Sequence, residues 1–226
     1  MQIQRQIRSF VRRCGRISHA QQQALEKLWS LYGYEQHESP TFEKLFARVA
    51  PINLEIGIGN GLALTTMAQN HPEQNYIGID VHKPGLGNTL ITIEQHQIQN
   101  IRLFCADAVE ILKELIPNHS LANVFLFFPD PWPKLRHRKR RLVQPEFVTL
   151  IAEKLIPGGK FFLATDWEDY AIQMMRVLSS ANQFQNAYGV NQFAPRVSDR
   201  PITKFEQRGE NLGHQVWDLV FINNSK

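Results

Sequence analysis

The chain has 226 residues, of which 43% are hydrophobic, so it is long enough to bury the core of a globular domain. It contains no apolar run of the roughly 20 residues that a membrane-spanning helix needs. Its two cysteines, Cys14 and Cys105, form no C-x-x-C pair. These features argue against a membrane protein and a zinc protein, and they predict a cytoplasmic protein in a reducing compartment.

The net charge of +4 hides an uneven distribution. Eleven of the 25 Lys and Arg residues lie in two acid-free stretches, 5–16 and 134–141, and the rest of the chain is acidic. Such stretches suit contacts with the phosphates of a polyanion, although a run of charge is also a common solvated surface. The N-terminal arginines lack the apolar core of a secretion signal. A mitochondrial transit peptide stays open as an alternative to the mobile basic arm that we favour.

The N-terminal stretch also predicts a helix. Ser18 and Gln21 match a capping box before a helix expected at residues 19–31. We therefore divide the chain into a basic arm with its helix, residues 1–35, and one larger domain, residues 36–226.

Strand-like and helix-like patterns alternate through the larger domain, which is the rhythm of a mostly parallel α/β sheet with helices on both faces. Apolar runs predict strands at residues 52–56, 75–79, 101–104, 124–128, 160–165 and 216–222. Helical spacing predicts helices at residues 62–69, 87–96, 108–115, 144–155 and 168–179. In sheets of this kind, ligands bind at the carboxyl ends of the strands.

A glycine turn follows the first of these strands. Gly57, Gly59 and Gly61 form G-x-G-x-G between strand and helix, where glycine lets the backbone approach a ligand closely. The spacing differs from the dinucleotide fingerprint G-x-G-x-x-G, and such glycine trios also occur in ordinary turns. The phosphate-binding pattern G-x-x-x-x-G-K-[ST] does not occur in the sequence.

Carboxylates stand at the ends of consecutive strands. Glu55, Asp80 and Asp107 belong to the first three strand units, and a parallel arrangement brings them to one crevice. Asp80 is placed to bind both hydroxyls of a ribose, and Asp107 to accept a hydrogen bond from an adenine amino group. Because acids rather than a phosphate-binding lysine surround the glycines, the crevice suits an adenosine ligand with a cationic end. S-adenosylmethionine has this chemistry.

A further carboxylate lies in the stretch FFPDPWPKLRHRKRR at residues 127–141. Prolines cannot donate hydrogen bonds to a sheet, so they end the strand and place Asp130 and Trp132 on a stiff loop beyond its carboxyl end. Six basic residues follow between Lys134 and Arg141. The alternative is a proline-rich connector with a solvated aspartate, and the neighbouring strand-end acids argue against it.

The chain resembles the tRNA (guanine-N7)-methyltransferases along nearly its whole length. The motifs that carry the resemblance are RSFVRRCGR at 8–16, LEIGIGNG at 54–61, IGIDVHKPGLG at 77–87, FFPDPWPKLRHRKRRLVQPEF at 127–147, TDW at 165–167 and TKFEQRG at 203–209. The resemblance implies a Rossmann-like class I S-adenosylmethionine-dependent methyltransferase fold with a mostly parallel seven-stranded sheet. It also implies a catalytic larger domain that methylates N7 of guanine 46 in the variable loop of tRNA, forming 7-methylguanosine.

The same resemblance assigns residue roles, with Asp130 as the catalytic residue. The methyl donor, S-adenosylmethionine, would be bound by Glu55, Gly57, Gly59, Gly61, Asp80, Asp107 and Asp130. The substrate would be held by Lys134, Asp166, Thr203, Lys204, Phe205 and Glu206. RNA would be contacted by Arg136, His137, Arg138, Lys139, Arg140 and Arg141. No metal is implied, and proteins of this kind occur as monomers or homodimers.

The chemistry can also be argued from guanine itself. Its N7 carries a lone pair that is nucleophilic at neutral pH, so methyl transfer needs alignment rather than a strong base. Asp130 or Asp166 can place negative charge beside the purine as it becomes cationic, or can read its N1–H and amino group, and the sequence leaves both roles open. Two other functions compete: a non-catalytic RNA-binding protein on a methyltransferase fold, and an amino-directed nucleic-acid methyltransferase, whose Asp-Pro-Pro-Tyr loop has a similar composition.

Overall fold

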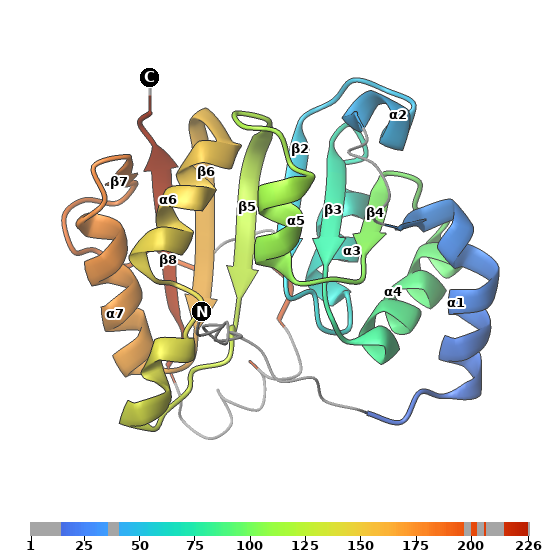
Figure 1. The fold of residues 1–226 in the computed structure, drawn as a ribbon, viewed down its shortest axis with the longest axis horizontal. Helices are drawn as coiled ribbons and strands as arrows, with labels where there is room; N and C mark the ends of the chain where they lie inside the picture. The colour runs from blue at the N-terminus through green and yellow to red at the C-terminus, as the bar shows by residue number, and fades with distance from the viewer. Residues whose placement is uncertain (1–14, 36–40, 197–199, 203–205, 207–214, 226) are drawn as a thin grey trace, which may run out of the picture.

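The computed structural model describes residues 15–35, 41–196, 200–202, 206 and 215–225. Its centre is an eight-stranded sheet with the strand order β1-β4-β3-β2-β5-β6-β8-β7 (Figure 1). The strands are β1 (Gly33–Tyr34), β2 (Ile52–Ile56), β3 (Asn75–Ile79), β4 (Ile101–Phe104), β5 (Leu121–Phe127), β6 (Leu155–Thr165), β7 (Phe184–Asn186) and β8 (Trp217–Asn223). Strands β1 to β6 run parallel, and β8 is antiparallel to both β6 and β7.

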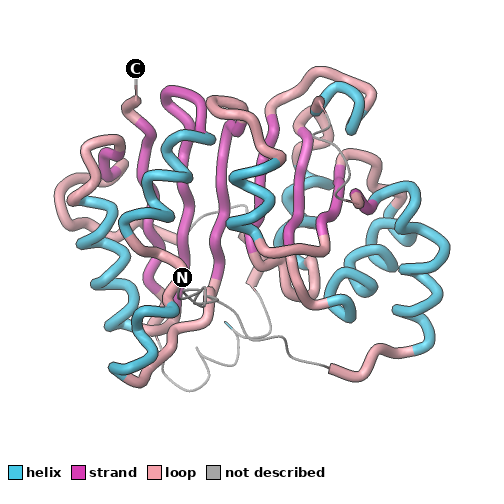
Figure 2. Tube along the Cα trace, in the orientation of Figure 1, coloured by secondary structure: helices cyan, strands magenta, loops and turns pink. Residues whose placement is uncertain are grey.

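Helices cover both faces of the sheet (Figure 2). They are α1 (His19–Tyr32), α2 (Phe42–Phe46), α3 (Leu62–Asn70), α4 (Lys83–His96), α5 (Ala108–Glu114), α6 (Pro145–Lys154), α7 (Glu168–Ser179) and the 3-10 helix η1 (Leu135–Arg140). One buried cluster joins α5, α6 and α7 to one face, and a second joins α1, α3 and α4 to the other. Within the described residues, no helix is both long and apolar enough to cross a bilayer.

The central strands are buried along their whole length because helices cover both of their faces. All five residues of β2 and all five of β3 are buried. The strands predicted at 52–56, 75–79 and 101–104 coincide with β2, β3 and β4. The α/β architecture and the mostly parallel sheet are therefore confirmed.

The sheet has eight strands rather than the seven expected. No apolar run predicts either short edge strand, β1 or β7; in β1, Gly33 and Tyr34 pair in parallel with Leu103 and Phe104 of β4. Two residues are too few to show the alternation by which a strand is recognised in sequence. Their pairing depends on where α1 places them at the edge of the sheet.

Helix α1 packs against α4. The capping box at Ser18 and Gln21 is formed, and Lys27 Nζ lies 2.6 Å from Glu94 Oε1 of α4. The contact is close, because a Cβ at Gly87 of α4 would lie 2.9 Å from the backbone oxygen of Gln21. The helix expected in a separate N-terminal unit thus shares the core of the sheet, while the division of the chain near residue 35 stays a prediction.

The direction in which the chain builds the sheet reverses between β2 and β5. After β2 the chain adds β3 and β4 on one side, and it then returns to add β5 and β6 on the other. Loops that leave adjacent carboxyl ends in opposite directions open a crevice between them. Glu55 of β2 aligns with Gly78 of β3 and with Phe125 of β5, so the acids that follow these strands meet at this edge.

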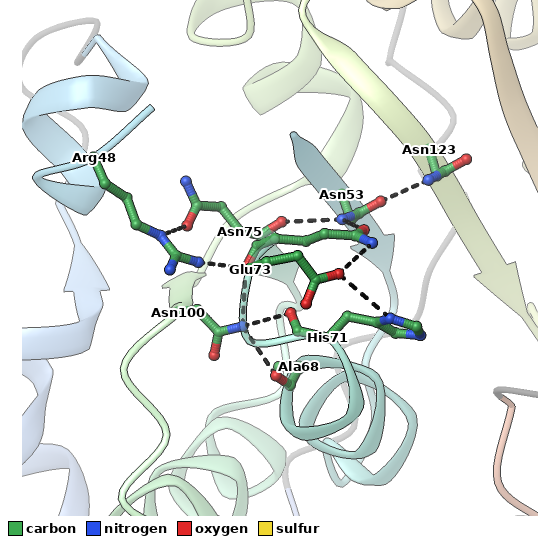
Figure 3. A network of polar contacts seen from close by, with 9 residues as sticks. Arg48, Asn53, Ala68, His71, Glu73, Asn75, Asn100 and Asn123 are labelled. Carbon is green, nitrogen blue, oxygen red and sulfur yellow. Dashed lines mark hydrogen bonds and ion pairs between the residues drawn. The ribbon is translucent and has the colours of Figure 1, made fainter. Parts of the chain in front are cut away.

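A network of side chains fastens the opposite, amino-terminal edge (Figure 3). Asn123 Nδ2 donates to Asn53 Oδ1 at 2.8 Å, and Asn53 Nδ2 donates to Gln74 Oε1 at 2.8 Å. Asn100 Nδ2 donates to three backbone oxygens between the end of α3 and the start of β3. Arg48 Nη2 donates to the backbone oxygen of Gln74 at 2.6 Å. These bonds satisfy polar groups of the turns, so the polar side chains at the amino-terminal edge have a structural role. The predicted site lies at the opposite, carboxyl edge.

Candidate active site

The glycine turn between β2 and α3 presents bare backbone to the crevice. Gly57, Gly59 and Gly61 have positive φ values of 75°, 58° and 81°, a conformation that disfavours side chains. A Cβ at Gly57 or Gly59 would meet nothing within 4 Å, so a ligand can approach the main chain there. At Gly61 a Cβ would lie 2.1 Å from Thr89 Oγ1, so that glycine lets α3 and α4 pack closely.

Asp80 holds this turn to the end of β3. Its Oδ2 accepts a hydrogen bond from the backbone N–H of Gly59 at 2.9 Å, and its Oδ1 accepts one from the N–H of His82 at 2.8 Å. A carboxylate offers about four acceptor positions, so it can also accept from the hydroxyls of a ribose. The structure places Asp80 beside the glycine turn, as a ribose-binding role requires.

Glu55 lies beneath Asp80 with only 3% of its surface exposed. Its Oε2 is buried without a hydrogen-bond partner among the described residues. Burial, and secondarily the negative charge of Asp80, raise the pKa of Glu55 to about 8. A buried polar atom without a hydrogen-bond partner is costly, so a ligand that brings a hydroxyl would fit this position, as would a cationic group that favours the ionised carboxylate.

We expect Glu55→Gln to change how stability depends on pH. In the wild type the free energy of unfolding should fall between pH 4.5 and about 8, because the unfolded chain has released a proton that folded Glu55 retains. The fall due to this group should reach roughly 3–5 kcal/mol, and it should be absent in the variant, because an amide does not ionise. Urea unfolding at both ends of this range, without methyl donor, measures the difference. A fall of the same size in both proteins would contradict the raised pKa.

Asp107 lies between β4 and α5, next to the end of β3 that carries Asp80. Its Oδ1 accepts from the N–H of Val109 at 2.8 Å and caps the helix. A cavity of about 510 Å³ opens next to it between α1, α4 and the end of β4, with Cys105, Ala106 and Leu86 in its wall. Its volume and its mixed polar and apolar lining are typical of a site for a small molecule.

The loop after β5 carries Asp130 in an unusual backbone. Phe128 and Trp132 have positive φ values of 51° and 43°, which large side chains rarely adopt. The N–H of Phe128 donates to the carbonyl of Ala164 in β6 at 2.8 Å. Asp130 itself is half-buried at the carboxyl edge. Burial raises the pKa of Tyr170 in α7 to about 12, and the charge of Asp130 acts weakly in the same direction.

The basic residues that follow lie in η1 or directly beside it, and they differ in exposure. Three of the side chains are exposed: Lys134, Arg136 and Lys139. Two others pack against Trp132, since the guanidinium carbon of Arg140 lies 4.9 Å from its ring centre and the ring of His137 meets it edge-on at 5.9 Å. Burial, followed by the surrounding positive charges, lowers the pKa of His137. The run is therefore partly a solvent-facing surface and partly a support for the loop.

Arg141 departs from the role expected of it. Only 1% of its side chain is exposed, and its guanidinium points into the space between the loop after β5 and helix α7. A buried guanidinium cannot contact an RNA phosphate without first leaving its partners. The burial of Arg141 therefore argues against its expected contact with RNA, and the RNA-contacting set as a whole stays a prediction.

The predicted substrate residues lie in different surroundings. Lys134 precedes η1, and Asp166 follows β6 at the same edge as Asp130. Glu206 is 1% exposed, and its two oxygens accept from Arg200 Nη1 at 2.6 Å and from Arg196 Nε at 3.3 Å. The carboxylate is thus bound by two arginines of this chain, and a direct contact with substrate stays a prediction. The remaining members, Thr203, Lys204 and Phe205, lie outside the described residues.

Sequence reasoning assigned no role to a buried charge pair beside the site. Arg200 is fully buried and donates from Nη2 to Asp218 Oδ2 at 3.1 Å. Its guanidinium carbon lies 5.7 Å from the ring centre of Phe127 and 5.2 Å from that of Phe128. The sequence feature that could have indicated this pair is Asp218, a charged residue inside the apolar run of β8, because a buried charge needs a partner.

The carboxyl edge therefore combines an open glycine turn, a buried acceptor oxygen and several strand-end carboxylates. These features fit an adenosine ligand with hydroxyl and cationic groups, the chemistry of S-adenosylmethionine. Among the described residues, no group of three or more His, Cys, Asp or Glu side chains is placed to hold a metal ion.

Comparison with known proteins agrees with this architecture. A family model described as "Putative methyltransferase" matches residues 49–219. The solved structure of the 16S rRNA methyltransferase KamB shares the fold with a TM-score of 0.63 at 15% identity, covering 86% of this chain and 99% of that one. A SAM-dependent O-methyltransferase of Thermotoga maritima matches with a TM-score of 0.52 at 10% identity, covering 95% of this chain and 68% of the other. The fold is thus that of the class I S-adenosylmethionine-dependent methyltransferases.

Sequence similarity narrows the family. The tRNA (guanine-N(7)-)-methyltransferase of Klebsiella pneumoniae subsp. pneumoniae is 53% identical over 218 residues, which are 96% of this chain and 91% of that protein. The protein of the same name from Aeromonas hydrophila is also 53% identical, over 96% of this chain and 92% of its own length. Because identity at this level extends over 96% of the chain, the chain belongs to the family of tRNA (guanine-N(7)-)-methyltransferases.

Proposed function

We propose that this protein transfers the methyl group of S-adenosylmethionine to N7 of guanine 46 in the variable loop of tRNA, forming 7-methylguanosine. The observation that carries the proposal is the 53% identity, over 96% of the chain, to a tRNA (guanine-N(7)-)-methyltransferase. The geometry of the site supports it independently, because β5, which the half-buried Asp130 and a partly exposed basic surface follow, lies beside β2, which the glycine turn of the donor crevice follows. We define this basic surface as Lys134, Arg136, His137, Arg138, Lys139 and Arg140.

The donor crevice suits S-adenosylmethionine, which supplies an electrophilic methyl group when bound. The bare backbone at Gly57 and Gly59 leaves room for its amino-acid end. Asp80 would accept from the ribose hydroxyls while it holds the glycine turn. Asp107 would lie beside the adenine, and the buried Oε2 of Glu55 would receive a donor that it lacks among the described residues.

The acceptor chemistry needs placement more than proton transfer. The lone pair of guanine N7 attacks without prior deprotonation, so the protein has to align it with the methyl group. Positive charge then develops on the purine, and a carboxylate fixed nearby stabilises it because the carboxylate is already oriented before the reaction. Asp130 and Asp166 follow the adjacent strands β5 and β6 and are the candidates for this role. Either could instead accept from the guanine N1–H and amino group.

The basic surface should provide the electrostatic part of tRNA binding. We expect the double change Arg136→Gln and Lys139→Gln to weaken binding and to reduce the slope of log K against log salt by about 1–2, because each phosphate contact releases counterions. Both side chains are exposed, so their removal should not disturb the fold. Filter binding at several salt concentrations measures the slope. Lys160→Gln, an exposed lysine on β6, is the matched control and should leave the slope unchanged. An unaltered slope in the double variant would exclude this surface as the RNA contact.

The experiment that tests the function is nucleoside analysis of unmodified tRNA after incubation with purified protein and methyl-labelled S-adenosylmethionine. The proposal expects label in 7-methylguanosine, and expects it to disappear when the tRNA carries adenosine in place of guanosine at position 46. Label in an N-methylated exocyclic amine would favour the amino-directed alternative. Binding of donor and tRNA without any label would favour an RNA-binding protein without catalysis.

A further inference from the structure

Arg141 is an enclosed cation with three acceptors. Its Nε donates to the backbone oxygen of Pro131 at 2.8 Å, its Nη1 to Gln173 Oε1 at 2.6 Å and its Nη2 to Asp169 Oδ2 at 2.6 Å. The guanidinium carbon also lies 4.8 Å from the centre of the Tyr170 ring. Every one of these contacts is internal, and only 1% of the side chain is exposed.

The contacts connect the loop of the proposed catalytic residue to a helix. Pro131 follows Asp130 directly, and the other three partners all belong to α7. Because a guanidinium is planar and rigid, it fixes the relative positions of acceptors bound at its different nitrogens. The loop also needs support, since a backbone with two large residues at positive φ persists only where its surroundings hold it.

We propose that Arg141 is a positioning residue for methyl transfer. It holds the main chain next to Asp130 against α7, and it does not contact RNA. This inference rests on the proposed function, because it concerns the rate of that reaction. A shift of about 1 Å in a reacting group can lower the rate by ~100-fold, so a loosened loop should reduce turnover rather than tRNA affinity.

Asp169 separates Arg141 from the basic surface. Its Oδ2 binds Arg141, whereas its Oδ1 lies 3.0 Å from Nη2 of Arg138, whose side chain is 40% exposed. Both arginines therefore bind the carboxylate of Asp169, but Arg138 lies on its solvent-exposed side and Arg141 on its buried side. For Arg141 to reach a phosphate, it would have to give up three hydrogen bonds, of which the one to Asp169 joins two charges.

The test compares Arg141→Lys with Lys139→Gln by measuring kcat, KM for tRNA and the salt dependence of tRNA binding. Lysine keeps the charge but cannot bind three acceptors in the geometry of a guanidinium. We expect Arg141→Lys to lower kcat by about 10–100-fold, with KM for tRNA within about 2-fold and the salt slope unchanged. Lys139→Gln, the matched change on the exposed surface, should raise KM and reduce the salt slope by about 1.

Two further measurements separate positioning from misfolding. In Arg141→Ala, added methylguanidinium should restore part of kcat, because it can occupy the place between Pro131 and α7 and renew the hydrogen bonds. Gln173→Leu removes one acceptor without touching Arg138, and it should lower kcat by a smaller factor while the thermal unfolding transition stays cooperative.

The outcomes are distinct. A higher KM with a flatter salt slope and unchanged kcat in Arg141→Lys would make Arg141 an RNA contact and overturn the inference. A folded Arg141→Lys protein with wild-type kinetics would overturn it as well. If the wild type does not methylate tRNA at all, the proposed function fails, and the inference fails with it.

Discussion

Asp130→Asn is expected to lower kcat for tRNA methylation by about 10²–10³-fold while the Kd of S-adenosylmethionine stays within about 3-fold. Asparagine has the shape of aspartate, and two of the contacts that hold this loop use the main chain: the N–H of Phe128 and the backbone oxygen of Pro131. The loop should therefore keep its position. What is lost is a fixed negative charge where the purine becomes cationic, or an acceptor that orients the guanine.

Single-turnover kinetics with saturating donor, together with calorimetric donor binding, separate these quantities. Asp166→Asn measured in parallel distinguishes the roles of the two carboxylates. The residue that hydrogen-bonds to the base should affect discrimination between guanine and adenine more than it affects the rate with guanine. Glu146→Gln replaces an exposed acid on α6 and should behave as the wild type. A loss of donor affinity as large as the loss of turnover would move Asp130 from the reacting centre to the donor site.

The position of the site was accessible from sequence because it depends on strand ends. β2 and β3 are buried on both faces, and both coincide with the strands expected at residues 52–56 and 75–79. In a parallel sheet, the residues that follow such strands meet at one edge, and this places Asp80 beside the glycine turn. The glycines themselves indicate close approach, and Gly57 and Gly59 do leave their Cβ positions open.

The roles within the basic run were not accessible from sequence. Lys139 and Arg141 are two residues apart in one run of positive charge, and nothing in composition or spacing distinguishes them. Their difference arises from tertiary structure, because α7 passes close to the end of η1 and offers Asp169 and Gln173 as acceptors. A run of charge predicts a surface, and the fold decides which of its members are turned inward.

A similar argument applies to the last part of the chain. Glu206 belongs to a motif whose resemblance implies substrate binding, but its carboxylate is enclosed by Arg196 and Arg200. Those arginines are ten and six residues away in the sequence along a stretch that shows no helical or strand periodicity. Strand β1 was not predicted because its two residues show no periodicity and form a strand only by pairing with the edge of β4.

Asp80→Ala is expected to weaken the binding of S-adenosylmethionine by about 100-fold, while kcat at saturating donor falls by less than about 3-fold. A charged acceptor for two ribose hydroxyls should contribute about 3 kcal/mol, which corresponds to this change in affinity. The same carboxylate accepts from the N–H groups of Gly59 and His82, so its loss also loosens the turn that faces the donor. Both effects act on the donor and leave the loop of Asp130 in place. Calorimetric donor binding and kcat at saturating donor measure the two quantities.

Asp80→Asn is the matched control, because its amide retains one acceptor oxygen but turns an N–H₂ group towards a backbone donor. Its affinity for the donor should lie between those of the wild type and Asp80→Ala. The charge of Asp80 also helps to raise the pKa of Glu55, so both variants should let Glu55 ionise at a lower pH. That ionisation would return part of the lost attraction for a cationic donor as the pH rises. The loss of donor affinity should therefore be greatest at acidic pH. An affinity loss that does not depend on pH would show that ionisation of Glu55 does not affect donor binding.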